Sequence, residues 1–295
     1  MKIACIIATI LISISSVFSQ KKVGLMIGIS DYESQSAKEY VWSKIHGVND
    51  VNLLSSTLSA QGFSIKTLLN ETATAQNIRK ELNYLTSNLS KGDIVYIHFS
   101  CHGQPIEDLD GDEDDGWDES IVPYDAKMEY IRGGYEGGNH IVDDELQSYF
   151  TKIRETVGEE GFLCVVIDAC HAGASSRSEN NDDNIETFSR GTKRGFSPNG
   201  KNYHPRINTS SHFEMVSQKN LSDIIILEAC RSYQTNYEIN EGNKYYGPLS
   251  FYINTILAKG ALLPQLDWVY EVKHLMDSDI RLIRQNMVYE STIKK

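Results

Sequence analysis

The chain has 295 residues, of which 40% are hydrophobic and 23% are charged, and its formal net charge is −12. This composition is ordinary for a globular protein, and the length suits one large domain or two small ones. A general nucleic-acid binder needs a basic surface, so the acidic balance argues against that class of protein.

The first twenty residues predict a secretory signal peptide. The segment MKIACIIATILISISSVFSQ places one Lys before a short apolar run, and small residues precede Gln20. The run is short for a membrane anchor, and no later segment is apolar enough to span a bilayer. We therefore expect residues 1–20 to be removed and residues 21–295 to form a single domain that is secreted or periplasmic and does not contact a membrane.

Apolar runs typical of strands alternate with helical patterns along the rest of the chain. In chain order we expect a strand at residues 22–29, a helix at 47–60, a strand at 63–69, a helix at 75–89 with Thr74 as its N-cap, a strand at 93–100, a helix at 143–157, strands at 162–169 and 223–229, and helices at 248–257 and 267–285. This alternation predicts an α/β fold with a mainly parallel sheet and helices on both faces. Two long stretches, residues 107–139 and 173–218, have the composition of loops.

Two of the expected strands end in residues that can carry out chemistry. SCHG (residues 100–103) ends one strand, and DACHAG (residues 168–173) ends the other. The carboxyl ends of parallel strands meet at one edge of a sheet, where open α/β proteins bind their ligands. We therefore expect Cys170 and His102 to converge there as a nucleophile and its general base and acid. Backbone N–H groups near Gly103 and at Cys170 would form an oxyanion hole.

Other interpretations of these strand ends stay open. Zinc binding would use both Cys-His pairs, although adjacent residues do not easily turn both side chains toward one ion. A disulfide would join Cys101 to Cys170, and a buried free thiol is the ordinary role of a cysteine in an apolar run. His98 lies on the same strand face as His102, and we interpret it as a packed histidine.

These motifs resemble those of metacaspase-type cysteine peptidases, which belong with the caspases, legumains and gingipains. The resemblance runs from about residue 22 to residue 260. It rests on segments that follow one another in the family's order, namely GLMIGISDY, GVNDV, ATAQNI, GDIVYIHFSCHG, DGDEDDGWDESIVPYD, IVDDEL, VVIDACHAG, LEACRSYQTNYE and GPLSFYI. The chain has SCHG where the family has SGHG and DACHAG where it has DSCHSG, so His102 and Cys170 are both retained.

The resemblance implies a caspase-like three-layer sandwich in which His102 is the general base and acid and Cys170 is the nucleophile. It further implies a monomeric enzyme that cleaves peptides or proteins after Arg or Lys and needs no cofactor for its chemistry. The family's acidic pocket corresponds to Asp50 and Asp168, with Ser100 on its wall. Strand alternation turns Asp168 to the same face as Cys170, and a carboxylate pair suits a guanidinium. Taken alone, Asp50 is equally a charge at a helix N-terminus.

The acidic segment EDLDGDEDDGWDE (residues 107–119) is either a solvated loop or part of a cation site. It is not an EF-hand, because Asp115 stands where that loop requires glycine. Many metacaspases need calcium, and the resemblance implies calcium as an activator, bound by Asp118, Asp143 and Asp144. The family has a further calcium-binding aspartate a few residues after the catalytic Cys. It has no clear counterpart here, because Arg177 occupies about that position.

The second long loop, residues 173–218, is rich in basic residues. A flexible basic segment is a suitable cleavage site for a peptidase specific for Arg and Lys, so we expect self-processing here. The candidate sites are Arg177, Arg190, Lys193 and Arg194. The alternative is a solvated loop that is never cut.

Two other functions stay open on the same fold. One is a catalytically silent module that binds calcium or peptides, against which the intact His102 and Cys170 argue. The other is a peptidase with a different preference for the residue before the cleaved bond, as in legumain-like or gingipain-like enzymes.

Overall fold

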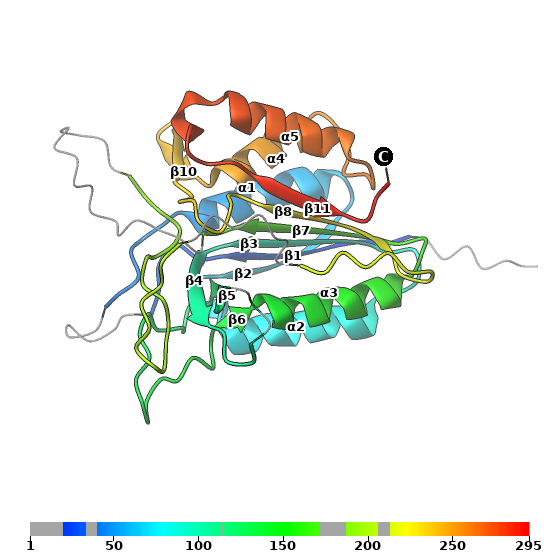
Figure 1. Ribbon diagram of the computed structural model, residues 1–295. Helices are drawn as coiled ribbons and strands as arrows, with labels where there is room; N and C mark the ends of the chain where they lie inside the picture. Colours follow the sequence, from blue (N-terminus) through cyan, green and yellow to red (C-terminus); the bar gives the residue numbers. More distant parts are fainter. Residues whose placement is uncertain are drawn as a thin grey trace, which may run out of the picture.

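Six strands form the central sheet of the molecule (Figure 1). They are β1 (Lys22–Gly28), β2 (Ser64–Leu69), β3 (Ile94–Ser100), β7 (Phe162–Asp168), β8 (Asp223–Glu228) and β11 (Val288–Ser291). Across the sheet the order is β11-β8-β7-β3-β1-β2, and every neighbouring pair is parallel except the antiparallel pair of β11 and β8. The structure is a computed structural model that describes residues 20–33, 40–111, 113, 115–170, 187–205 and 213–294.

The register of the central strands brings their polar ends to one edge of the sheet. Ser100 at the end of β3 is the Cα partner of Gly28 on β1 and of Asp168 on β7. Both β3 and β7 are buried along their whole length. Alternate side chains of a strand point to opposite faces of the sheet, so a parallel strand covered on both faces needs apolar residues at successive positions. This explains the long apolar runs before Ser100 and Asp168.

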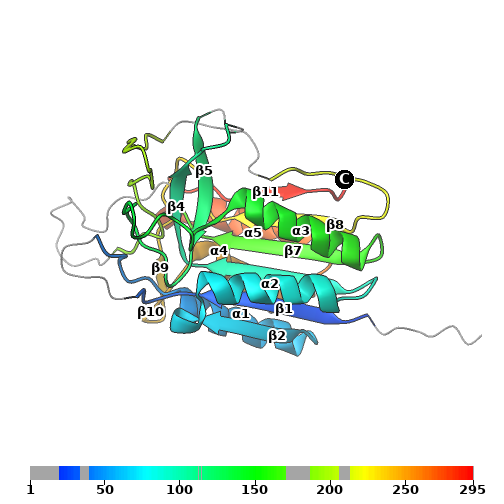
Figure 2. The same ribbon diagram turned by 90° about the horizontal axis from the view of Figure 1, so that it is seen from below.

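Helices cover both faces of the sheet, as Figures 1 and 2 show. One face carries α1 (Gly47–Ala60), α4 (Pro248–Leu257) and α5 (Asp267–Ser278), and the other carries α2 (Ala75–Asn88) and α3 (Asp143–Val157). Each face has its own apolar core. Val95, Ile97 and Phe99 of β3 pack on the α2 and α3 side, whereas Tyr96 packs on the opposite side. The three-layer α/β sandwich predicted from the sequence is therefore confirmed.

A second, smaller sheet lies beyond the carboxyl edge of the central one. It contains β4 (His102–Glu107), β5 (Trp117–Val122) and β6 (Ile141–Val142), all antiparallel. A hairpin of β9 (Ile239–Glu241) and β10 (Lys244–Tyr246) also lies at this edge. The predicted loop at residues 107–139 contains β5, which the sequence does not indicate because short strands of mixed polarity lack a long apolar run.

The last predicted helix is shorter in the structure than expected. The helix α5 ends at Ser278, and Asp279 adopts an extended conformation before the 3₁₀ turn η2 (Ile280–Leu282). The Asp279 side chain accepts a hydrogen bond from the Arg281 N–H. Such a local side-chain bond competes with continuing the helix, which frees the remaining residues to reach the edge strand β11.

The predicted signal peptide lies outside the described residues except for Gln20. Within the described ranges, no helix has both the length and the apolar character required to cross a membrane.

The central strand β3 provides a test of the packing. Phe99 is fully buried between the sheet and the α2–α3 layer, so Phe99→Ala is expected to lower the free energy of unfolding by about 3–5 kcal/mol. Tyr84 on α2 is 58% exposed, and Tyr84→Ala should change that free energy by less than about 0.5 kcal/mol. Urea unfolding measures both values, and equal losses would contradict the assigned core.

Candidate active site

His102 and Cys170 follow the adjacent strands β3 and β7 at the carboxyl edge of the sheet. His102 begins β4, and Cys170 lies two residues after the end of β7. Each side chain is almost fully buried, with a relative exposure of 1%. The sheet register that pairs Ser100 with Asp168 therefore brings the two strand ends to the same place.

The ring of His102 is held in one orientation by its surroundings. Its Nε2 atom donates a hydrogen bond to the Ser43 carbonyl oxygen at 2.8 Å. Trp42 stacks on the ring at a centroid distance of 5.1 Å, and Tyr32 lies at 5.1 Å with its ring tilted. Because a carbonyl can only accept, Nε2 carries the proton and Nδ1 has a free lone pair. Nδ1 makes no hydrogen bond with any described residue, and the backbone of Arg190 lies beside the ring.

Burial lowers the pKa of His102 to about 4. The imidazole is therefore neutral near pH 7, and its Nδ1 atom can accept a proton. Ser43, Trp42 and Tyr32 were not recognised as site residues in the sequence. They lie in the segment between β1 and α1, where no sequence pattern indicates a contact with His102.

The Cys170 thiol points at the segment that follows β8. Its Sγ donates to the Gln234 carbonyl oxygen at 2.8 Å, and the Cys230 thiol forms a hydrogen bond to Cys170. That hydrogen bond, together with burial, raises the pKa of Cys230 well above its usual value. All four cysteines in the described part of the chain are free thiols, so Cys101 and Cys170 are not joined in a disulfide.

The structure also bears on the zinc and His98 alternatives. His171 lies outside the described residues, and among the residues that are described no group of three Cys, His, Asp or Glu side chains could hold a metal ion. His98 is fully buried, and its two ring nitrogens hydrogen bond with Tyr96 at 3.1 Å and Ser250 at 3.1 Å. It is a packed histidine within the core.

The carbonyl group of Arg190 lies between the two strand ends. Its oxygen accepts hydrogen bonds from the backbone N–H of Gly103 at 3.0 Å and from that of Cys170 at 3.2 Å. Two convergent N–H donors on one carbonyl are the arrangement that stabilises a developing oxyanion. The two donors are the same pair that the sequence motifs indicated.

The side chain of Arg190 fills the pocket beside this carbonyl and is fully buried. Its Nη2 atom lies 2.7 Å from Asp50 Oδ2, and its Nη1 atom lies 3.3 Å from Asp168 Oδ1. Nη1 also donates to Ser100 Oγ at 2.8 Å. The structure therefore brings Asp50, Ser100 and Asp168 together around one guanidinium. Glu238, at 2.8 Å from Nη2, is a third carboxylate that the sequence reasoning missed.

Three carboxylates around one guanidinium give the pocket an excess of negative charge. Burial would raise the pKa of Asp168, but Arg190 and hydrogen bonds from Ser250 and Asn236 keep it below its usual value. Glu238 is held low in the same way by Arg190 and His46, again against the effect of burial. For Asp50 burial dominates and raises the pKa to about 7. One of the three carboxyl groups therefore takes up a proton near neutral pH.

The backbone around Arg190 is bound as an added strand. The Arg190 N–H donates to the Asn236 carbonyl at 3.0 Å, and the Glu238 N–H donates to the Phe188 carbonyl at 2.9 Å. Gly191 then crosses directly over Cys170, and a Cβ atom added there would lie 2.1 Å from the Cys170 carbonyl oxygen. The Arg190–Gly191 peptide bond therefore lies across the two strand ends as a bound peptide would.

The predicted calcium ligands lie on β5 and at the start of α3. Asp118 is half-buried on β5, whereas Asp143 is buried and Asp144 exposed at the start of α3, where carboxylates suit the helix dipole. These aspartates do not form a group of three metal-ligating side chains with one another or with the other described residues. Arg177 lies outside the described residues, and Lys193 and Arg194 are exposed.

Comparison with known proteins identifies relatives of this chain. A family model described as the metacaspase, peptidase C14 domain matches residues 21–177. The metacaspase-1 of Eremothecium gossypii is 30% identical over 162 residues, which cover 51% of this chain and 32% of that protein. The metacaspase-1A of Aspergillus niger is 29% identical over 166 residues, which cover 52% of this chain and 36% of that protein. The chain thus spans about a third of the length of the curated relatives it matches.

Solved structures share the fold at low sequence identity. A crystal structure of a Geobacter sulfurreducens protein matches 93% of this chain and 94% of its own, with a TM-score of 0.62 and 16% identity. The structure of pro-sf-caspase-1 matches 94% of this chain and 89% of its own, with a TM-score of 0.50 and 12% identity. These likenesses concern the arrangement of the backbone.

The buried ion cluster predicts a pH-dependent stability loss. In a Cys170→Ala background, which prevents cleavage, Arg190→Ala should lower the free energy of unfolding by about 3 kcal/mol at pH 8, because three buried carboxylates lose their counter-charge. Without Arg190 their folded-state pKa values rise above the unfolded values, so the folded state binds more protons and the loss shrinks as pH falls toward 5.

Denaturant unfolding at the two pH values measures this effect. Arg190→Lys keeps one positive charge and should lose less stability, and Lys193→Ala, at an exposed position, serves as the surface control. An equal loss for Arg190→Ala at pH 8 and pH 5 would show that the cluster is not electrostatically coupled.

Proposed function

This chain belongs to the metacaspase family of peptidases, and on that premise we propose that it is a cysteine endopeptidase that cleaves after Arg or Lys. One observation supports the proposal above the others. The Arg190 side chain occupies an acidic pocket while its own carbonyl oxygen receives hydrogen bonds from the N–H groups of Gly103 and Cys170. A residue held in this way presents the bond that follows it to the thiol and the imidazole.

The proposed reaction uses only groups of this chain and one water molecule. His102 Nδ1 takes the proton of the Cys170 thiol as the sulfur attacks the carbonyl carbon of the residue in the pocket. The Gly103 and Cys170 N–H groups stabilise the negative oxygen of the tetrahedral intermediate. His102 then gives its proton to the departing amine, which leaves a thioester on Cys170. Water, activated by the same imidazole, hydrolyses the thioester and restores the thiol.

The pocket favours Arg over Lys. In the structure the guanidinium of Arg190 reaches three carboxylates and the Ser100 hydroxyl at once. A planar fork can make several such bonds in fixed directions, whereas an ammonium group acts as a single compact charge. The three carboxylates would repel an acidic residue before the cleaved bond. The pocket therefore also argues against a caspase-like preference for Asp.

The chain is proposed to process itself at the Arg190–Gly191 bond. Of the four basic residues considered from the sequence, Arg190 is the one that occupies the pocket. Until this bond is cut, the chain's own arginine fills the position that a substrate would need. Self-cleavage is therefore the step that releases the pocket for other substrates.

Further properties are proposed on the sequence resemblance. They are calcium as an activator with Asp118, Asp143 and Asp144 as ligands, export to the periplasm or the medium, and a monomeric state. The reaction described above takes no step through calcium. The silent binding module and the legumain-like preference are less well supported, because His102 and Cys170 follow adjacent strands beside Arg190 and an acidic pocket surrounds its side chain.

Self-processing is tested with purified wild-type protein incubated with calcium or with a chelator. We expect wild-type fragments whose new N-terminus reads Gly-Thr-Lys, from cleavage before Gly191, with faster cleavage in calcium. Cys170→Ala should remain intact, and Arg190→Gln should lose this fragment. Gly191→Val should slow the cut by at least about tenfold, because a side chain there meets the Cys170 backbone. Intact wild-type protein under both conditions would refute self-processing.

The pocket assignment is tested with two peptide substrates that differ only in Arg or neutral citrulline before the bond. The ratio of their kcat/KM values should fall about 3–10-fold as the pH is lowered through the titration of Asp50, because burial raises its pKa to about 7 even with Arg190 beside it. Protonation of the dyad affects both peptides and cancels in the ratio. Asp50→Asn should give a flat ratio, and Asp168→Asn should lower it about 10–100-fold across the same pH range. An unchanged ratio in both variants would disprove the pocket.

A further inference from the structure

The bound segment continues past the Arg190–Gly191 bond along the outer edge of β4. Gly191 and Phe196 form parallel bridges with Gly103 and Ile106. Phe196 N–H donates to the Pro105 carbonyl at 2.8 Å. A chain leaving the cleavage point in the carboxyl direction therefore touches the edge of β4 at two points and bulges away from it between them. Main-chain pairing with a sheet edge is a common way of binding extended peptides.

Arg194, the fourth residue after the bond, makes side-chain contacts on this path. Its guanidinium carbon lies 3.7 Å from the centre of the Tyr40 ring, and its Nη1 atom lies 2.7 Å from Glu129 Oε1. Its carbonyl oxygen accepts a hydrogen bond from Gln104 Nε2 at 2.8 Å. An aromatic face and a carboxylate around one guanidinium recognise both its planar shape and its charge.

The neighbouring Lys193 provides a contrast within the same segment. Its side chain is exposed, and no residue that the structure describes forms an ion pair with it. Two adjacent cations are therefore treated differently: the Arg194 guanidinium contacts Tyr40 and Glu129, whereas the exposed Lys193 side chain borders the same cleft without an ion pair to the described residues.

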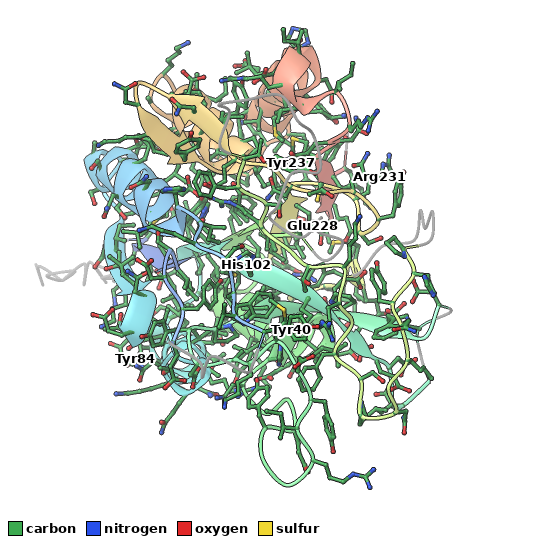
Figure 3. The ribbon with its side chains drawn as sticks, turned by 90° about the vertical axis from the view of Figure 1, so that its left-hand side faces the viewer. Tyr40, Tyr84, His102, Glu228, Arg231 and Tyr237 are labelled. Atoms are coloured by element: carbon green, nitrogen blue, oxygen red, sulfur yellow. The ribbon has the colours of Figure 1, made fainter. Side chains whose placement is uncertain are left out.

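These contacts border a cleft that reaches His102. The cleft has a volume of about 670 Å³, and its lining includes Tyr40, Trp42, His102, Glu129 and Arg194. In Figure 3, Tyr237 and Tyr40 lie on opposite sides of His102. The segment before the bond pairs with Tyr237 through Ser189, so the cleft at Tyr40 is the side that receives the residues after the bond.

We propose that Tyr40 and Glu129 form a subsite for a cationic side chain located four residues after the cleaved bond. The inference rests on the proposed peptidase function and concerns its substrate class: peptides with Arg before the bond and a second Arg or Lys at the fourth position after it. The contact is partly exposed, with 42% and 33% of the Arg194 and Glu129 side chains accessible to solvent. Its effect is therefore modest and falls mainly on substrate binding.

The experiment uses self-processed full-length enzyme carrying Arg194→Ala, so that the chain's own arginine does not compete for the subsite. Three quenched fluorescent peptides are compared: FSRGTKRGF, which copies residues 188–196, the same peptide with Ala at the fourth position after the bond, and one with Ala at the third. For cleavage of the bond between the first Arg and Gly, identified from the product fragments, the first peptide should have a KM about 3–10-fold below that of the second with a similar kcat. Replacing the third-position Lys should change KM less than about twofold.

Variants of the subsite residues provide the second arm. Tyr40→Leu and Glu129→Gln should each reduce the preference for the fourth-position Arg at least about twofold. Tyr84→Leu should preserve it, because Tyr84 lies on α2, does not line the cleft, and is apart from Tyr40 and His102 in Figure 3. Raising the salt concentration from about 0.05 to 0.5 M should shrink the preference, because the ion pair is exposed.

A short substrate that ends in Arg and carries only a fluorescent leaving group separates the two hypotheses. If this substrate is cut and the three peptides have equal KM values, the subsite is wrong and the proposed function stands. If neither the short substrate nor the three peptides are cut, the proposed function fails and the subsite fails with it. A preference that survives both Tyr40→Leu and Glu129→Gln would also overturn the assignment to these residues.

Discussion

The burial of one guanidinium among three carboxylates is the interaction on which the site depends. A charge inside a protein is tolerated only when opposite charges and hydrogen bonds surround it. Asp50 from α1, Asp168 from the end of β7 and Glu238 from the segment before β9 meet this requirement for Arg190. Parts of the chain that are distant in sequence are thus tied to a single side chain.

The carboxylates are themselves held in place before any substrate arrives. Ser250 donates to Asp168 through both its backbone N–H and its hydroxyl group, and the Gly247 N–H donates to Asp50. These donors belong to the start of α4, where backbone N–H groups lack partners within the helix. The free N-terminus of this helix therefore supports the pocket, and the carboxylates do not need to reorganise when a cation binds.

The backbone on either side of Arg190 is recognised through strand pairing. Before the bond the segment pairs antiparallel with residues near Tyr237, and after it the segment runs parallel to β4. Main-chain hydrogen bonds of this kind accept many sequences, so discrimination has to come from side-chain pockets. In the proposed enzyme, the pocket around Arg190 and the contact of Arg194 with Tyr40 and Glu129 would supply two such points along one extended peptide.

The sequence by itself determined the order of the main strands and helices, because long apolar runs and helical periodicity report burial locally. It also placed His102, Cys170, Ser100 and Asp168 near one another, since the ends of parallel strands share an edge, whereas Asp50 joined them only through the resemblance to the metacaspase family. Only the tertiary structure decided that Glu238 joins the pocket, that Ser43 orients His102, and that Arg190 rather than a neighbouring basic residue is buried there. Those contacts join residues from separate loops and short strands, whose positions depend on packing across the whole sheet edge and leave no periodic signal in the sequence.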